Sequence, residues 1–72
     1  MTVIKTDEGL YLDVTTIERL EIEEGKIVVA YVRGVNYAFE VRTLETEYRA
    51  LKFKAYMELA IKLAKEVEAE EE

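Results

Sequence analysis

Carboxylates, lysines, threonines and tyrosines are the side chains of this sequence that could take part in chemistry. The 72 residues include no histidine, no cysteine and no serine. Catalytic triads of Ser or Cys with His are therefore excluded, because their nucleophile and base are missing, and a structural zinc site lacks its usual ligands. Without histidine, a general base at neutral pH would need to be a Glu or Lys with a strongly shifted pKa.

Paired carboxylates are the main catalytic groups that this composition still allows. Two Asp or Glu residues can hydrolyse a glycosidic bond, but they need a cleft deep enough to raise the pKa of one of them. A chain of 72 residues has little volume for such a cleft. The acidic residues also lack the D-x-[DN]-x-[DN]-G spacing of a calcium loop. We therefore predict that the protein is not an enzyme and that it holds no cofactor and no metal ion.

The charge balance is acidic and argues against several partners. Sixteen Asp and Glu residues against ten Lys and Arg residues give a net charge of -6, which opposes binding to a phosphate backbone. The sequence has neither a run of about 20 apolar residues that could span a membrane nor a charged-then-apolar leader. We expect no nucleic acid partner, no membrane partner and a cytoplasmic location. We interpret the basic residues of the predicted helix as a solvated face with ion pairs: Arg49, Lys52, Lys54, Lys62 and Lys65.

Residue usage gives a further indication of the class of protein. Glu and Lys are abundant, whereas Gln and Cys are absent and Asn occurs once. This usage is typical of hyperthermophilic proteins, and engineered, idealised sequences share it. A small core without disulfides leaves regular packing or self-association as the means of stabilisation. The composition predicts a thermostable scaffold, either of hyperthermophile type or a de novo design.

Hydrophobic periodicity divides the chain into strands and one helix. Residues 1–42 alternate apolar and polar side chains in short runs, as the strands of a half-buried sheet do. Residues 43–69 repeat apolar residues at helical spacing, with Thr43 as the predicted cap and residues 70–72 as a frayed acidic tail. We predict a single α+β domain: a small antiparallel sheet of four or five short strands, with a barrel-like curl as an option, followed by one long C-terminal helix packed on it.

Two turn signals predict local structure in the strand region. Residues 15–18 match the capping box S/T-x-x-E, which predicts one helical turn capped by Thr15. Residues 24–25, a Glu-Gly pair, predict a two-residue hairpin turn. That turn places Leu20 opposite Val29 on the same face of the sheet.

The segment that follows leads into a second hairpin. Residues 27–32 are apolar on both faces, which is typical of a central strand that is covered on each side. A five-residue loop after this strand pairs Tyr31 with Tyr37, whereas a two-residue turn pairs Ala30 with Tyr37. We favour the longer loop, because the shorter one would require a positive φ at Arg33.

The predicted helix carries more apolar surface than one sheet can cover. One stripe, the expected core face, contains Leu44, Tyr48, Leu51, Ala55 and Leu59. A second arc beside it contains Phe53, Tyr56, Met57, Ala60, Leu63, Ala64 and Val67. A helix that lies on one small sheet needs an apolar face of about 100°. The stripe and the arc together exceed that width, so a second cover is needed.

Two arrangements would cover the second arc. The sheet could curl around the helix, or the arc could pack on the same arc of an identical subunit across a two-fold axis. The two-faced strand at residues 27–32 favours the second arrangement, since one helix covers only one face of an open sheet. We therefore predict a homo-oligomer, with a dimer favoured, whose self-association interface is the second arc.

These features predict a non-catalytic interaction domain whose first partner is itself. The alternative is an acidic adaptor or nucleic-acid mimic that docks on a basic protein partner through its Glu-rich surface. We expect the Glu-rich residues 66–72 to be a solubilising end. The tyrosines are expected in the core with their hydroxyls at the surface, or along a small pocket or wet interface: Tyr11, Tyr31, Tyr37, Tyr48 and Tyr56.

One stretch of the chain resembles a known family. Residues 13–20, followed by residues 25–28 and Tyr31, are similar to the strand, turn and Gly-Lys hairpin of the small crenarchaeal chromatin proteins. Those proteins are SH3-like barrels with a C-terminal helix, so the resemblance implies a barrel-like sheet followed by a helix. The second hairpin of that family carries an aromatic, basic DNA-binding face. At those positions this sequence has acids, which argues against DNA binding: Glu21, Glu23 and Glu24.

Overall fold

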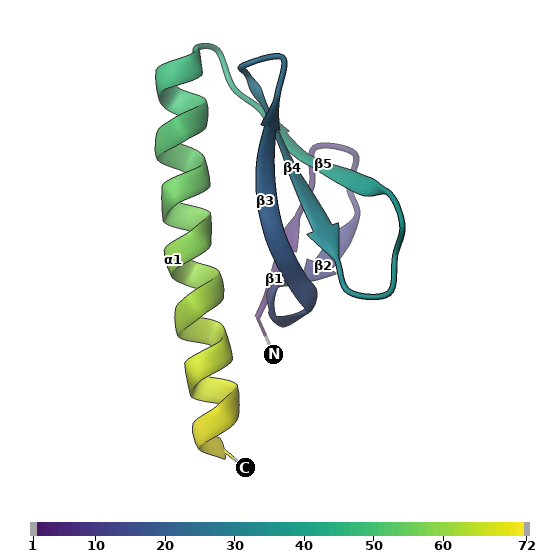
Figure 1. The fold of residues 1–72 in the computed structure, drawn as a ribbon, viewed down its shortest axis with the longest axis vertical. Coiled ribbons are helices and arrows are strands. Elements are labelled where there is room, and N and C mark those ends of the chain that lie inside the picture. The colour runs from purple at the N-terminus through teal and green to yellow at the C-terminus, as the bar shows by residue number, and fades with distance from the viewer. Residues whose placement is uncertain (1, 72) are drawn as a thin grey trace.

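The computed structural model describes residues 2–71, which form five short antiparallel strands followed by one long helix (Figure 1). The predicted α+β class and the order of strands before helix are confirmed. The elements in chain order are β1 (Val3–Lys5), β2 (Tyr11–Asp13), the 3₁₀ helix η1 (Val14–Thr16), β3 (Ile17–Glu23), β4 (Ile27–Val32), β5 (Ala38–Thr43) and α1 (Glu47–Glu71).

The strands are divided between two sheets that are fastened to each other by one aspartate. β1 and β2 form a hairpin, and β3, β4 and β5 form a three-stranded sheet with β4 in the centre. Asp7, in the β1–β2 turn, donates its backbone N–H to the carbonyl of Val41 at 3.1 Å. Its carboxylate accepts from the Thr43 backbone N–H at 3.0 Å and from Arg42 Nε at 3.2 Å. The turn of the hairpin is therefore held against β5.

The register of the β3–β4 hairpin differs by one residue from the predicted register. Leu20 lies opposite Ala30, not Val29. The loop has three residues, because Lys26 lies outside the ladder with β3 and its carbonyl accepts from the Leu44 backbone N–H at 2.9 Å. The prediction of a two-residue turn was wrong, because this bond to the segment after β5 could not be read locally.

The second hairpin differs from both predicted registers. Tyr31 lies opposite Ala38, so the loop is one residue longer than the longer of the two predicted loops. The register also shifts within β5, where Val41 is an extra residue, 1% exposed, whose carbonyl accepts the bond from Asp7. Such a bulge redirects a side chain at the cost of local pairing. Here it adds Val41 to the core.

A second bulge in β3 increases the apolar content of the core face. Ile17 and Leu20 are three residues apart, so strict alternation would place them on opposite faces. The register shifts between Ile17 and Arg19, and both Ile17 and Leu20 are buried, at 0% and 4% exposure. Because the bulge supplies one extra residue, both side chains point to the core.

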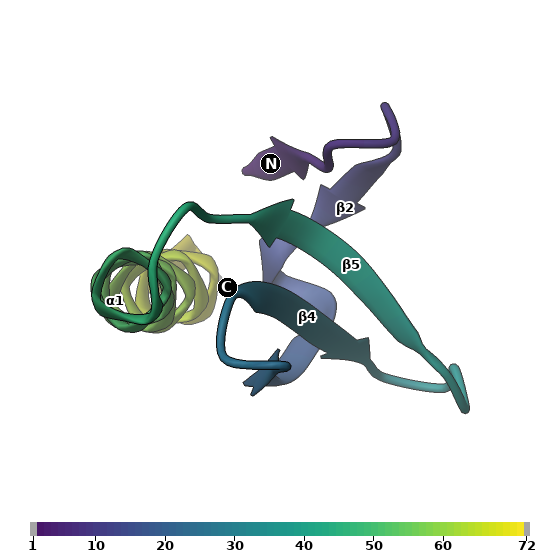
Figure 2. The same cartoon turned by 90° about the horizontal axis from the view of Figure 1, so that it is seen from above.

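The core lies where the three-stranded sheet, the β1–β2 hairpin and α1 meet (Figure 2). β4 crosses the middle of this core, as predicted for residues 27–32, with Val28 and Ala30 completely buried. The remaining buried apolar residues come from every other element except β1: Leu12, Val14, Ile17, Leu20, Val41, Ala50, Met57 and Ile61.

The face of β4 that points away from the core is flanked by long side chains of the neighbouring strands. Val29 points away from the core and is still only 1% exposed. Its cross-strand neighbours on that face are Glu21 and Glu40. Arg19 donates a hydrogen bond from Nε to the Glu21 carboxylate at 3.1 Å. Its guanidinium group also stacks over the Tyr31 ring, with the guanidinium carbon 3.9 Å from the ring centroid. By its sequence the two-faced strand favours a partner subunit, but Val29 is already buried within the single chain, so this strand no longer supports that expectation.

The helix begins four residues later than predicted. Thr43 is the last residue of β5, and the helix cap is Thr46, whose hydroxyl accepts from the Arg49 backbone N–H at 3.1 Å. Thr43 does not cap the helix because it still belongs to β5, where it lies opposite Ile27. At the other end the helix continues through Glu71, which includes part of the predicted frayed tail; residue 72 lies outside the described residues.

Thr46→Ala removes the oxygen that caps α1 and should lower the free energy of unfolding by about 1 kcal/mol. Thr46→Ser keeps that oxygen and should cost much less. Urea unfolding followed by circular dichroism at one fixed protein concentration measures both. Equal losses in the two variants would contradict this assignment of the cap.

Candidate functional site

The face of α1 that packs on the sheet is a narrow stripe of small and medium apolar residues. Ala50, Met57 and Ile61 are buried on the helix, and Phe53 and Ala64 are half-buried beside them. The stripe carries no charged residue, and Arg42 of β5 closes one side of it with its guanidinium carbon 5.2 Å from the centre of the Phe53 ring. This stripe, with its spacing of three and four residues, is the face expected of a packed helix.

The predicted core stripe of the helix was wrong. Four of its members, Tyr48, Leu51, Ala55 and Leu59, are exposed, and Leu44 precedes the helix. Sequence analysis placed neither Ala50 nor Ile61 on an apolar face, and both are buried. Charge does not separate the two faces: Lys62 and Glu66 interrupt the predicted stripe near its C-terminal end, but the exposed row Leu51, Ala55, Leu59, Leu63 and Val67 carries no charge either. The position of the sheet therefore decides which apolar face of the helix is buried.

The seven residues of the predicted self-association arc fall on two sides of the helix. Met57 is buried against the sheet, and Phe53 and Ala64 are half-buried there, so these three belong to the subunit core. The other four are exposed: Tyr56, Ala60, Leu63 and Val67. Only these four remain accessible to a partner, and the interface itself stays a prediction.

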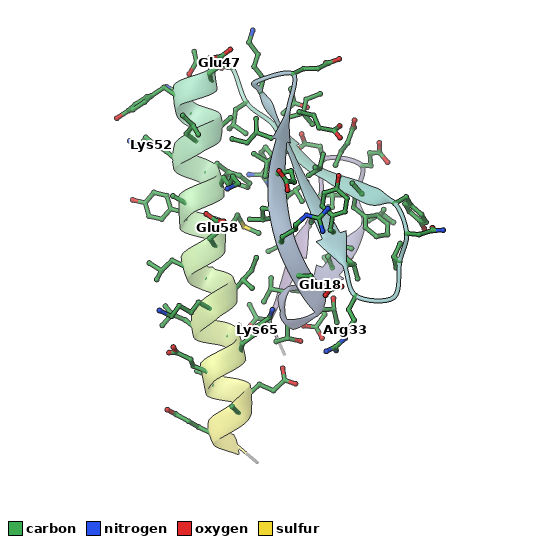
Figure 3. All side chains as sticks on the ribbon, viewed as in Figure 1. Glu18, Arg33, Glu47, Lys52, Glu58 and Lys65 are labelled. Atoms are coloured by element: carbon green, nitrogen blue, oxygen red, sulfur yellow. The ribbon has the colours of Figure 1, made fainter. Side chains whose placement is uncertain are left out.

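The solvent-facing side of α1 carries an apolar surface, here called the outer face. Its six large side chains are 52–71% exposed, and together they leave on the order of several hundred Å² of apolar area in water, comparable with the largest patch on a typical monomer. Figure 3 shows Lys52 on this side, pointing away from the sheet. The outer face consists of Tyr48, Leu51, Ala55, Tyr56, Leu59, Ala60, Leu63 and Val67.

The outer face has the form of a ridge with a groove beside it. One row at four-residue spacing is apolar from end to end: Leu51, Ala55, Leu59, Leu63 and Val67. Rows of this spacing are the ridges that fit between the ridges of a second helix. A shallow depression of about 330 Å³ lies among Lys52, Ala55, Tyr56 and Leu59, between this row and the next. The surface therefore has the relief of a helix-packing face.

A larger hollow of about 570 Å³ lies between the C-terminal half of α1 and the segment around η1. Its floor is apolar, from Ala60, Leu63, Ala64 and Val67, and Glu68 stands at its end. The opposite wall is polar and consists of Thr2, Asp13 and Thr15.

Two long-range bonds fix the walls of this hollow. Val14 donates its backbone N–H to the Thr2 carbonyl at 3.0 Å, which brings Thr2 to η1. On the other side of the helix stripe, Lys65 reaches the sheet (Figure 3) and donates from Nζ to the Ile17 carbonyl at 2.9 Å. The C-terminal half of α1 and η1 are therefore held at a defined separation, and the hollow between them is a consequence.

Asp13 caps η1 and provides the charge on the wall of the hollow. A single helical turn is present, but it begins two residues earlier than predicted, at Val14, and its cap is Asp13, not Thr15: the Asp13 carboxylate accepts from the Thr15 hydroxyl at 2.7 Å and from the Thr15 backbone N–H at 3.0 Å. These two bonds lower the pKa of the Asp13 carboxyl below its ordinary value. The polar wall of the hollow therefore carries an ionised carboxylate at neutral pH, and the two bonds from Thr15 fix its orientation.

The tyrosines are mainly surface residues. Tyr11, Tyr37, Tyr48 and Tyr56 are 59–71% exposed, and Tyr31 is half-buried beneath Arg19. The expectation that the tyrosines form the core was wrong, because β-branched and aliphatic residues fill it. Tyr48 and Tyr56 instead belong to the outer face of α1.

The remaining charged groups give little indication of a reaction centre. Within residues 2–71 no three carboxylates gather at spacing suited to a metal ion. Of the ion pairs expected for the basic residues of the helix, the pair of Lys54 with Glu58 is formed, at 3.3 Å. No helix formed by residues 2–71 combines the length and the apolar character needed to cross a bilayer. The distinctive features of this surface are therefore the outer face and the hollow beside it, both suited to binding.

Comparison with known proteins gives no relative from which a role could be transferred. No protein-family model matches the chain, and no curated protein and no solved structure is significantly similar to it. The basis for a functional inference is therefore the chemistry of the surface.

The bonds from Thr15 predict a pH dependence of stability that is specific to Asp13. Its folded-state pKa lies below the ordinary value of 3.8, so ionised Asp13 stabilises the fold above that pH, and the contribution is lost as the pH falls through the lowered pKa. Asp13→Asn keeps an acceptor oxygen but not the charge. It should be less stable than the native protein at about pH 6, and the difference should narrow as the pH falls toward about 2. Urea unfolding at both pH values tests this, and a gap that does not change with pH would contradict it.

Proposed function

We propose that this protein is a non-catalytic self-association domain that forms a homodimer through the outer face of α1. The observation that carries the proposal is the uninterrupted apolar row from Leu51 to Val67 on the solvent side of a helix whose other side is already packed. In the single chain more than half of each large side chain in this row remains in water. A second copy supplies the same ridge and the same groove, as an isologous two-fold contact requires.

The size of the outer face is sufficient for a modest dimer. Burying a side chain the size of Leu or Val contributes about 1.5–3 kcal/mol, and each copy offers six large apolar side chains that are more than half exposed. Association costs on the order of 4–15 kcal/mol in lost translational and rotational freedom. Two such faces can supply more than this cost, at a total interface near the lower limit of about 1,000 Å² for specific contacts.

Leu63→Glu tests this proposal, because Leu63 lies in the apolar row and is 52% exposed in the single chain. The carboxylate would be desolvated in the dimer but stay in water in the single chain, so dissociation should become easier by roughly 100-fold or more. Light scattering behind a sizing column at micromolar concentration should show a two-chain mass for the native protein and a one-chain mass for the variant. Circular dichroism should show that the variant remains folded.

Tyr37→Glu is the matched control for this experiment. It replaces another large side chain, 59% exposed in the loop between β4 and β5 and remote from α1 (Figure 1), with the same carboxylate. It changes the net charge by the same amount as Leu63→Glu and should leave the two-chain mass unchanged. A native protein of one-chain mass, or equal effects of the two substitutions, would refute the proposed dimer.

Salt distinguishes this dimer from the alternative of an acidic adaptor that docks on a basic partner. Apolar contacts persist or strengthen at high ionic strength, whereas contacts between exposed charges are screened. The two-chain mass should therefore persist in about 1 M NaCl. Dissociation to single chains under these conditions would show that charge, not apolar area, holds the copies together.

A further inference from the structure

The outer face of α1 is electrically asymmetric along its length. The exposed side chains of Arg49 and Lys52 lie toward its N-terminal end, whereas toward its C-terminal end the acids Glu66 and Glu70 outnumber the single base Lys62. Two such faces packed in parallel would bring like charges together at both ends, which is costly at an interface. Antiparallel packing brings each basic end to an acidic end. Charge complementarity therefore selects the antiparallel arrangement of two copies.

The charges also indicate where the two-fold axis lies. Arg49 and Glu70 are equally far along the helix from the point between Leu59 and Ala60. A two-fold axis at that point places the basic end of each helix over the acidic end of the other. It also passes through the apolar part of the outer face, where the two helices can approach most closely.

This axis brings two side chains of the second copy to the mouth of the hollow. Tyr56 of one copy lies opposite Leu63 of the other, and Lys52 lies opposite Val67, because each pair is equally spaced about the axis. Leu63 and Val67 form part of the floor of the hollow. Tyr56 is 71% exposed in the single chain, and Lys52 points away from its own sheet (Figure 3). Both side chains are therefore accessible to the second copy.

The hollow has the chemistry to hold an aromatic ring together with an ammonium group. Its volume of about 570 Å³ is within the range of about 300–1,000 Å³ typical of ligand sites. The apolar floor suits the ring, and a buried tyrosine hydroxyl needs a polar partner, which the hydroxyls of Thr2 and Thr15 can provide. The carboxylates of Asp13 and Glu68 suit the lysine ammonium.

We propose that each hollow is completed by the second copy: in an antiparallel two-fold dimer, Tyr56 and Lys52 of one protomer fill the hollow of the other. The contact occurs twice per dimer. This inference rests on the proposed self-association, and it adds the orientation of the helices and the residues that meet.

A charge exchange tests the contact between Lys52 and Glu68. Lys52→Glu places acid against acid in its own homodimer, and Glu68→Lys places base against base, so each variant alone should dimerise at least about tenfold more weakly than the native protein. When the two variants are mixed, both contacts of the heterodimer become Glu against Lys. The heterodimer should therefore recover to within about threefold of native affinity. Both positions are exposed, and circular dichroism should confirm that both variants fold.

The measurement is capture of an untagged variant by a tagged one. Tagged Lys52→Glu should retain untagged Glu68→Lys, and it should not retain untagged Lys52→Glu, which is the matched control. A native dimer in which the mixture shows no recovery would overturn the antiparallel contact and leave the proposed dimer intact. A native protein of one-chain mass would overturn both.

Discussion

Burial of the stripe from Ala50 to Ala64 against the three-stranded sheet is the interaction on which the rest of the molecule depends. A three-stranded sheet must bury its apolar face against another element to be stable. A single long helix likewise gains most of its stability from tertiary packing. The two elements therefore stabilise each other. Once this stripe is buried, the orientation of every other residue on α1 follows, including the apolar row on the far side.

Two β-bulges, one in β3 and one in β5, allow the sheet to pack its apolar side chains against α1. The bulges near Glu18 and at Val41 turn extra apolar side chains toward α1, and Asp7 fastens the β1–β2 hairpin to the strand that carries the second bulge. A small domain has little apolar area to bury. Each bulge therefore loses some backbone pairing between strands but adds a buried apolar side chain to the core. In a core this small, the added apolar burial outweighs the lost pairing.

The proposed binding surface is a direct consequence of the same packing. The helix is apolar around more than one face, and the sheet can cover only one of them. The hollow arises because α1 extends past the sheet toward η1, where Asp13 and Thr15 hold a short polar turn against an apolar helix. Stability and the proposed association therefore depend on two sides of one helix in a chain of 72 residues.

The sequence by itself determined the α+β class, the central place of residues 27–32, the absence of the usual catalytic triads and the excess of apolar residues on the helix, because composition and periodicity are local properties. Tertiary structure alone decided which apolar face of the helix is core. Both faces satisfy the same helical spacing, so Met57 and Tyr56, adjacent in sequence, could be assigned only by the position of the sheet. The same holds for the hairpin registers and for the caps at Asp13 and Thr46, which depend on hydrogen bonds from distant residues or on where the preceding strand ends. The hollow beside η1 is lined by Thr2 and Asp13 together with residues of α1 that lie about 50 positions later in the sequence. No local sequence pattern encodes that proximity.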